Sequence, residues 1–199
     1  MHKPAGFDAT KAVGETILII LGGHHLIVKA VKEMLSKNGK EMIVVYIDTA
    51  PGDTQPGYFS HEFASDIRPD KRWPRAGRMY IVVTDNNGNC SRSFKSFIVS
   101  VEKSNPGFQT QWGDNFAAQF KGKRIGGVYG EVESEYNGKV SMRRELRWFV
   151  ADDKVESTKV PEPKYLPNRN TVKAIPATGA APTVDAFVEV TGDLNEIPF

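Results

Sequence analysis

The chain has 199 residues, a formal net charge of +2 and 40% hydrophobic residues. This length predicts one domain plus a tail, and the composition is sufficient for a hydrophobic core. The longest apolar run, residues 17–21, is far shorter than the ~20 residues that a membrane span needs, and the N-terminal residues lack the order of a signal peptide. A single cysteine, Cys90, excludes an intrachain disulfide framework and a Cys-based zinc site. These features predict a cytoplasmic protein with no membrane partner.

The charge is unevenly distributed along the chain. Residues 176–199 contain four acidic side chains and no Lys or Arg, so residues 1–175 carry a formal charge of +6. A basic body can attract a polyanion, whereas an acidic tail can compete for the same surface or recruit a third molecule. A chance partition of a modest charge is the alternative explanation.

Two apolar runs near the N-terminus, residues 25–35 and 41–49, predict a β-hairpin. The first run also fits one face of a helix. However, Asn38-Gly39 between the runs supplies the positive φ that tight hairpins need, and the second run contains MIVVYI, which is rich in β-branched residues. We therefore expect two antiparallel strands here.

Further along the chain, residues 57–63 and 79–84 are each expected to form a strand. Residues 91–103 have apolar side chains at helical spacing behind Ser91, which predicts one helix with Ser91 as its N-cap. After a short aromatic stretch, residues 121–151 predict a second hairpin with Asn137-Gly138 at its turn. The count favours a mainly β (α+β) fold, an OB-like Greek-key barrel with one helix, and a β-sandwich with a helix fits nearly as well.

The composition changes after Val155. Residues 156–183 contain five prolines mixed with Asn, Thr, Ala and Gly, and they show no apolar period. Such a segment is typical of an extended linker without a core to join. The expected organisation is a globular domain (1–155), a flexible linker (156–183) and an acidic, partner-binding tip (184–199).

The tip ends in an unusual way for a polar, acidic segment. Its last residues are apolar and follow two carboxylates. This ending resembles the C-terminal tip of bacterial and phage single-stranded-DNA-binding proteins (SSBs), which docks as a peptide on enzymes of replication, recombination and repair. The resemblance implies that Phe199 enters an apolar pocket while carboxylates meet a basic rim; a frayed terminus that ends on Phe is the alternative. The implied partner-binding residues are Asp193, Glu196, Ile197, Pro198 and Phe199.

The body also resembles a group of proteins. Over about residues 22–155, the succession Gly22-Gly23, SKNGKEM, PGYF, DKRWP, SNPG, KGKRIGG and EYNG is similar to small proteins of bacteriophage replication and recombination modules. The segment before Gly22 (ETILIIL) is more apolar than that resemblance implies. Together the two resemblances imply a non-catalytic phage SSB that coats single-stranded DNA without sequence preference in the host cytoplasm. Because SSBs often assemble into multimers, the resemblance also allows a homo-oligomer.

Binding single-stranded DNA requires cations along the phosphates and aromatic faces on which bases stack, and two stretches offer both. In the first, Trp73 lies among Arg and Lys side chains, and a structural role as a lid on the barrel is its alternative. In the second, strand alternation places Tyr129 with Glu131 and Glu133, away from phosphates, and places Trp148 in the core. The predicted nucleic-acid-binding residues are Lys71, Arg72, Trp73, Arg75, Arg78 and Tyr80 in the first stretch, and Lys121, Lys123, Arg124, Arg143 and Arg147 in the second.

Signals of catalysis are weaker. His24-His25 would point to opposite faces of a strand, which is poor geometry for one metal ion, and no phosphate-binding glycine loop is complete. We therefore expect no catalytic residue, no metal and no cofactor. One alternative is a metal-dependent nuclease or resolvase that combines Asp152-Asp153 with Glu131 or Glu133. Another alternative is an accessory factor that binds proteins and has no affinity for DNA.

Overall fold

The computed structural model describes residues 2–4, 7 and 17–167. A compact unit ends at Pro167. The predicted tip (184–199) and residues 168–183 of the predicted linker lie outside the described residues, so the expectations for them remain predictions.

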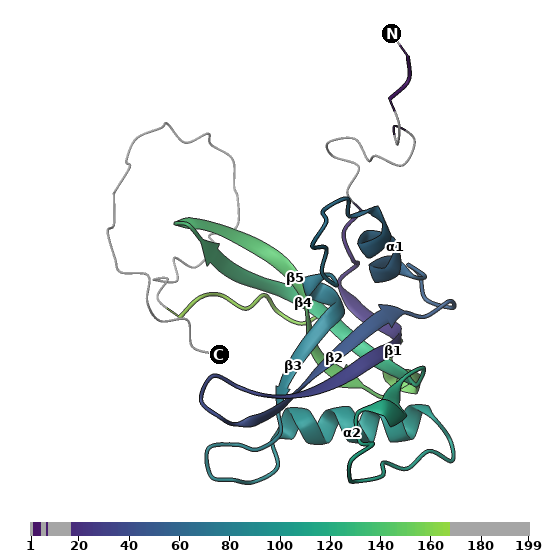
Figure 1. Ribbon diagram of the computed structural model, residues 1–199, viewed down its shortest axis with the longest axis vertical. Helices are drawn as coiled ribbons and strands as arrows, with labels where there is room; N and C mark the ends of the chain where they lie inside the picture. Colours follow the sequence, from purple (N-terminus) through teal and green to yellow (C-terminus); the bar gives the residue numbers. More distant parts are fainter. Residues whose placement is uncertain (1, 5–6, 8–16, 168–199) are drawn as a thin grey trace. The chain divides into compact units, whose positions relative to one another are not determined.

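In the described part of the chain, the strands form one antiparallel sheet with the order β3-β2-β1-β4-β5 (Figure 1). Both predicted hairpins are confirmed, and the fold is mainly β. Two α-helices and three short 3-10 turns complete it. In chain order the elements are β1 (Gly22–Leu35), β2 (Glu41–Thr49), α1 (Tyr58–Ser65), η1 (Arg75–Gly77), β3 (Arg78–Val82), α2 (Arg92–Ser104), η2 (Ala118–Phe120), β4 (Arg124–Tyr136), β5 (Lys139–Val150) and η3 (Asp152–Lys154).

A β-bulge at Lys29 explains the irregular sequence pattern of β1. The register with β2 shifts between Val28 and Ala30, so Lys29 is the extra residue. One extra residue reverses which side chains point inward. Accordingly Leu26 and Val28 are buried before the bulge, and Val31 is buried after it. The helical alternative for this segment is wrong, and the bulge is what made the strand look irregular.

A second bulge places Trp148 outside the core, contrary to our expectation. Val128 of β4 pairs with Trp148, but the next residue, Tyr129, pairs with Leu146, so Arg147 is the extra residue. Leu146 is buried, whereas Trp148 is 38% exposed. Simple alternation had put these two side chains on one face, and the bulge separates them.

Helix α1 replaces the strand that we expected over residues 57–63. The Asp48 side chain of β2 caps its start, because Asp48 Oδ1 accepts a hydrogen bond from the backbone N–H of Phe59 at 2.9 Å. Phe59 is fully buried, and Phe63, one turn later, packs against Trp73 with ring centroids 5.5 Å apart. The aromatic residues suggested a strand, but a cap from a distant carboxylate and spacing of one helical turn favour a helix.

Helix α2 confirms the expected helix and its cap. Ser91 Oγ accepts a hydrogen bond from the backbone N–H of Phe94 at 3.1 Å. The buried face of α2 includes Phe94, Phe97 and Val101, and the helix lies against β4 and β5 across one end of the sheet (Figure 1). At 13 residues α2 is longer than α1, and no helix among the described residues combines the length and apolar character that crossing a membrane requires.

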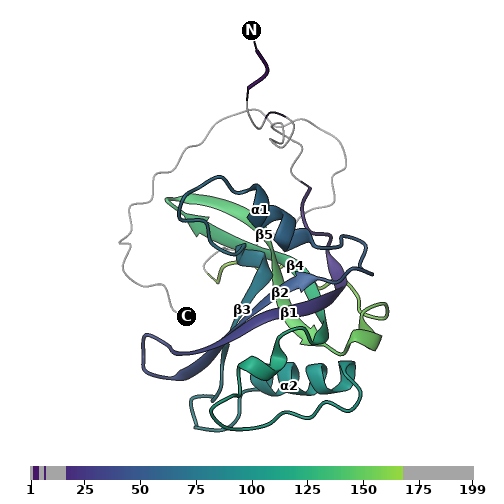
Figure 2. The same cartoon turned by 45° about the vertical axis from the view of Figure 1, so that its right-hand side comes forward.

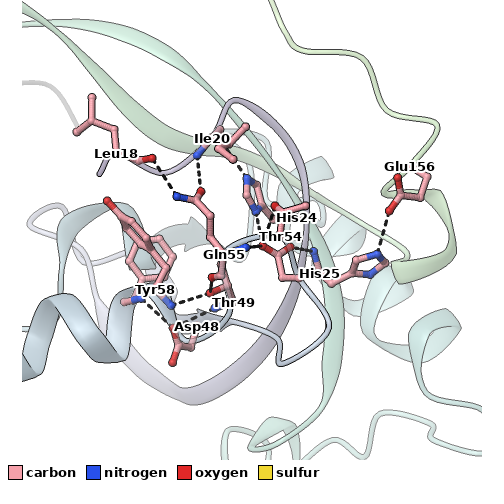
Figure 3. Close-up of polar contacts among 12 residues, drawn as sticks. Leu18, Ile20, His24, His25, Asp48, Thr49, Thr54, Gln55, Tyr58 and Glu156 are labelled. Atoms are coloured by element: carbon pink, nitrogen blue, oxygen red, sulfur yellow. Dashed lines mark hydrogen bonds and ion pairs between the residues drawn. The ribbon is translucent and has the colours of Figure 1, made fainter. Parts of the chain in front are cut away.

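The apolar segment before β1, residues 17–20, is fixed by side chains that are distant in sequence (Figure 3). Gln55 binds it twice, since its Nε2 donates to the Leu18 carbonyl at 3.1 Å and its Oε1 accepts from the Ile20 N–H at 2.7 Å. The Tyr58 hydroxyl donates to Ile17, and Arg144 donates to the carbonyl of Ile19. The segment is therefore part of the domain, with Ile19 in the core.

Residues 155–166, which we name the strap, run along β4 instead of leaving the domain at Val155. The Lys164 N–H donates to the Glu131 carbonyl at 2.9 Å, and the Lys164 carbonyl accepts from the Glu133 N–H at 2.7 Å. This forms a parallel bridge beside β4, in the part of β4 beyond the last residue that pairs with β1. The start of the expected linker is thus paired backbone within the compact unit.

Glycines in β1 and β4 allow the strap to pack closely against the sheet. A Cβ on Gly23 would lie 2.4 Å from the Val155 carbonyl oxygen, and one on Gly126 would lie 2.7 Å from a Val155 methyl group. At Gly130 a Cβ would lie 2.5 Å from Pro161. Side chains at these positions would push the strap away from the sheet, because close-packed atoms do not approach so near. Gly126 and Gly130 in the sequence KRIGGVYG therefore allow close contact between β4 and the strap.

We predict that Gly23→Ala destabilises the domain by about 1–3 kcal/mol, the usual cost of overpacking. Urea denaturation followed by circular dichroism would measure this change. Gly52→Ala is the matched control, because a Cβ at Gly52 meets no atom within 4 Å, and it should change the free energy of unfolding by no more than about 0.5 kcal/mol. Equal stabilities for the two variants would contradict the role assigned to Gly23.

An ionic latch links β1 to Asp152 in η3 and to Glu156 at the start of the strap. His25 Nδ1 lies 2.7 Å from Asp152 Oδ1, and its Nε2 lies 3.4 Å from Glu156 (Figure 3). The other Asp152 oxygen lies 2.7 Å from the Arg124 guanidinium. Burial alone would lower the pKa of His25, but the hydrogen bonds and negative charges of the two carboxylates raise it, and the net pKa is above the usual 6.5.

The raised pKa predicts a pH-dependent stability. A histidine whose pKa is higher in the folded state stabilises the fold below its unfolded pKa, near 6.5, and this contribution is lost as the pH rises through the folded pKa. Urea denaturation at pH 6 and pH 8 should therefore show a larger loss of stability for the wild type than for His25→Gln. His61→Gln is the control and should behave like the wild type. An identical pH dependence in His25→Gln and the wild type would refute the latch.

Candidate nucleic-acid interface

Trp73 is held as a structural residue. Its indole N–H points at the carbonyl oxygens of Ile47 and Gly77, at 3.1 and 3.0 Å. The ring is partly buried against the core and contacts Phe63. A Cβ at Gly77 would lie only 2.6 Å from the indole nitrogen, so the fit is close. These contacts support the lid role for Trp73 over base stacking.

The cations of the first predicted stretch differ in their surroundings. Arg75 reaches from η1 to β5, where its Nε lies 2.9 Å from Glu145 Oε1. The Lys71 ammonium lies 4.8 Å from the Phe63 ring centroid, and Arg72 is exposed. Arg75 therefore has a structural contact across the gap between η1 and β5, whereas Lys71 and Arg72 are available at the surface.

The cations of the second predicted stretch also differ, because some have structural partners and others lie at the surface. Arg124 is engaged by Asp152, and Arg147 donates from Nη1 to the carbonyls of Glu131 and Glu162, at 3.2 and 3.3 Å, which joins β5 to the strap. Lys123 lies over the Phe108 ring at 4.4 Å. Lys121 is exposed, and Arg143 is half-buried on β5. Arg124 and Arg147 are thus primarily structural.

Two tyrosines and two cations come together on one face of β1, β2 and β3. Lys32 and Tyr80 are both paired with Val44, one from each side, and Tyr46 is paired with Arg78. Val44 and Tyr46 of β2 are two positions apart, as are Arg78 and Tyr80 of β3. Paired residues and residues two positions apart share a face, so the side chains of Lys32, Tyr46, Arg78 and Tyr80 point to the same side of the sheet. We name Lys32, Tyr46, Arg78 and Tyr80 the tyrosine patch.

Each tyrosine of the patch has its own cation. The Lys32 ammonium lies 5.6 Å from the centroid of Tyr46, and the Arg78 guanidinium carbon lies 5.9 Å from the centroid of Tyr80. Both distances suit a cation–π contact. Tyr80 is 51% exposed and Tyr46 is half-buried. The patch thus offers aromatic surface and positive charge at the same place.

Only half of the patch was predicted from the sequence. Arg78 and Tyr80 were among the expected binding residues, but Lys32 and Tyr46 were missed. The bulge at Lys29 reverses the alternation before Lys32, so counting from the start of β1 places Lys32 on the inner face. Tyr46 lies in the almost continuously apolar run MIVVYI, where no polar residue marks the outer face. A search for aromatic residues inside such runs would have raised Tyr46 as a candidate.

The adjacent histidines point to opposite sides of β1, as expected. His24 is buried, with Nδ1 2.9 Å from Asp53 Oδ1 and its ring edge against Tyr129, whereas His25 joins the latch to Asp152. Burial alone would raise the pKa of Asp53, but hydrogen bonds from His24 and from backbone N–H groups leave it below the usual 3.8. His24 and Asp53 therefore form an internal polar contact beneath the start of β1.

Two of the four carboxylates considered for a metal site are engaged by other groups. Asp152 is held by the latch, and Glu133 is buried and accepts a hydrogen bond from the Leu166 N–H at 3.1 Å. Within residues 17–167 and the few described residues before them, no group of three or more His, Cys, Asp or Glu residues is placed so that it could hold a metal ion.

Comparisons with known proteins do not assign the chain to a family. None of the known family models matches it. A search of curated proteins finds no significant match either.

The assignment of Trp73 as a lid gives a testable prediction. Trp73→Phe should reduce the free energy of unfolding by about 1 kcal/mol, because the indole hydrogen bond is lost while most of the ring is kept. The same variant should retain wild-type affinity for any nucleic acid that the protein binds. Thermal denaturation and fluorescence anisotropy measure the two quantities. A large loss of affinity with unchanged stability would instead restore Trp73 as a stacking residue.

Proposed function

We propose that this protein binds single-stranded DNA through the tyrosine patch and is a phage-type SSB without catalytic activity. The observation that carries the proposal is the pairing of Tyr46 with Lys32 and of Tyr80 with Arg78 on one open face of the sheet. Proteins that coat single strands without sequence preference stack bases on aromatic side chains and follow the phosphates with cations. The patch has both components within a few ångströms.

The topology supports an OB-like barrel as the platform. β1 pairs with β2 on one side and with β4 on the other, and α2 lies between β3 and β4 in the chain and covers one end of the sheet. The two edge strands of the sheet are β3 and β5, and η1, directly before β3, contacts the β4–β5 side. The Tyr129 hydroxyl of β4 donates to the Ala76 carbonyl of η1 at 3.0 Å, and Arg75 of η1 meets Glu145 of β5. We propose that the sheet closes here through side chains. OB-type barrels are common platforms for single strands.

The β4–β5 hairpin offers a further contact for the strand. It reaches beyond the sheet, as does the β1–β2 hairpin, in another direction (Figure 2). Strand alternation separates its charges, with the glutamates of residues 131–135 on one face and Tyr136 with Lys139 and Arg143 on the other. We propose that the second face, together with Lys71, Arg72 and Lys121, attracts phosphates near the patch.

The acidic tip supplies the second half of the proposal. Its carboxylates and Ile197-Pro198-Phe199 resemble the peptide with which SSBs recruit enzymes of replication, recombination and repair. This part of the proposal depends on the sequence, because the tip lies outside the described residues.

Fluorescence anisotropy with a labelled poly-dT oligonucleotide tests the binding proposal. We expect the wild type to prefer the single strand over a duplex and to bind more weakly as salt increases, because phosphate contacts release counterions. Tyr80→Ala should weaken binding by about 5- to 100-fold, as expected for the loss of one stacked base. Tyr80→Phe should retain most of the affinity. Tyr165→Ala removes a similarly exposed tyrosine outside the patch and is the matched control.

Several outcomes of this experiment would contradict the proposal. Equal affinity for duplex and single strand, or equal effects of Tyr80→Ala and Tyr165→Ala, would remove the patch as the binding surface. Absence of binding to either nucleic acid would favour an accessory factor that binds only proteins, and magnesium-dependent cleavage of the oligonucleotide would favour a nuclease. Deleting residues 184–199 should leave the DNA affinity unchanged or raise it.

A further inference from the structure

A second surface of the domain is an apolar cleft between the β1–β2 hairpin and the segment that follows α2. Its volume is about 530 Å³, and none of the tyrosine-patch residues lines it. The hairpin contributes Met34, Leu35 and Met42, and Leu35 is 63% exposed. The opposite wall is aromatic. We name this the hairpin cleft; Phe94, Trp112 and Phe116 form its aromatic wall.

Trp112 is held in an exposed position by buried rings. It stacks on Phe116 with centroids 5.3 Å apart and ring planes 16° from parallel, and Phe116 lies 6.0 Å from Phe94. Phe94 and Phe116 are buried, whereas Trp112 is 69% exposed. One face of the indole is thus supported by the core, and the ring presents a large apolar surface to solvent. An exposed, anchored tryptophan is typical of binding surfaces.

The cleft continues past Trp112. An adjoining hollow of about 340 Å³ shares Val83, Phe94 and Trp112 with it and is lined further by Thr84, Cys90, Lys95 and Ile98. Two hollows side by side on either part of a shared wall can take neighbouring side chains of one peptide, so an extended peptide suits this surface.

Two carboxylates determine which charge the cleft accepts. Glu33 and Glu41 line it, and the β1–β2 register places them on one face beside Leu35, since Glu33 pairs with Ile43 and Leu35 with Glu41. Neither forms an ion pair within the described part of the chain. Negative charge here repels phosphates, and it equally repels the acidic residues 184–199 of this chain. Nucleic acid and the chain's own tip are therefore poor occupants.

We propose that the hairpin cleft binds a basic, apolar peptide segment of a partner protein. A Lys or Arg side chain of the peptide lies between Glu33, Glu41 and the Trp112 ring, where ion-pair and cation–π contacts act together. A neighbouring apolar side chain of the peptide fills the space beside Leu35 and Met42. This surface is additional to the proposed DNA-binding patch and does not depend on it.

Nuclear magnetic resonance of the tryptophan side chains tests the proposal on the full chain. The sequence has three tryptophans, Trp73, Trp112 and Trp148, so the ¹⁵N-labelled protein gives three indole signals. The probe is the peptide acetyl-Arg-Leu-Lys-Leu-Arg-amide, and its control replaces the cations with Glu. We expect the basic peptide to shift the Trp112 signal in a saturable way while the Trp148 signal stays constant, and the acidic peptide to have no effect.

Substitutions that remove the negative charge and keep the size of the side chain test the role of the two carboxylates. Glu33→Gln combined with Glu41→Gln should weaken binding of the basic peptide by about 3- to 10-fold, as expected for the loss of two exposed ion pairs. Glu135→Gln combined with Asp153→Asn removes two exposed carboxylates elsewhere and should change nothing. Tyr80→Ala should keep peptide binding, so a failure of the DNA proposal and a failure of this one are distinguishable.

Three results would overturn the proposal. The first is no saturable shift of Trp112 with the basic peptide. The second is an equal shift with the acidic peptide, which would point to a purely apolar site open to the chain's own tip. The third is a Trp112 shift that follows protein concentration without peptide, which would show that a second copy of the chain covers the cleft.

Discussion

The β-bulge at Lys29 is the constraint on which the rest of the sheet depends. Before it, β1 pairs with β4 on one side and β2 on the other, and after it β1 continues with β2 alone. At the bulge, Val28 exchanges hydrogen bonds with the turn before β4, with its N–H donating to Lys123 and its carbonyl accepting from Gly122. The reversal keeps Val31 in the core and turns Lys32 to the outer face, where it meets Tyr46. One inserted residue thus helps to form both the core and the tyrosine patch.

Local patterns were sufficient to predict much of the fold, and long-range contacts explain the failures. The two hairpins and α2 were predictable because Asn-Gly turns, β-branched runs and a Ser cap act within a few residues. Helix α1 was not, since its cap is Asp48, eleven residues before Phe59. The bulge at Arg147 overturned the expected face of Trp148, and the bulge at Lys29 put Lys32 on a face that simple alternation does not give it, because a bulge depends on the partner strand as well as on the strand itself.

The two candidate surfaces of the domain differ in charge. The tyrosine patch combines aromatic rings with Lys32 and Arg78, whereas the hairpin cleft combines an aromatic wall with Glu33 and Glu41. Both present an accessible aromatic ring, Tyr80 in the patch and Trp112 in the cleft, so apolar contact alone would not distinguish their ligands. Electrostatic complementarity provides that distinction and lowers the chance that one ligand occupies the other's surface.

The strap has a consequence for how the domain folds. Contacts between the first part of the domain and its last part span more than half of the chain, since His25 of β1 meets Asp152 of η3 and Glu156 of the strap over separations of 127 and 131 residues. Arg144 of β5 likewise reaches Ile19, before β1, over 125 residues. Contacts with such large sequence separations close slowly, because most of the chain must be ordered before they form. During synthesis from the N-terminus, β1 therefore leaves the ribosome long before its last partners exist. Until the strap arrives, the glycine-lined face of β1 and β4 is uncovered, and β4 lacks the backbone partner that Lys164 provides at Glu131 and Glu133, so a newly made chain has an unpaired strand edge there that another strand can pair with.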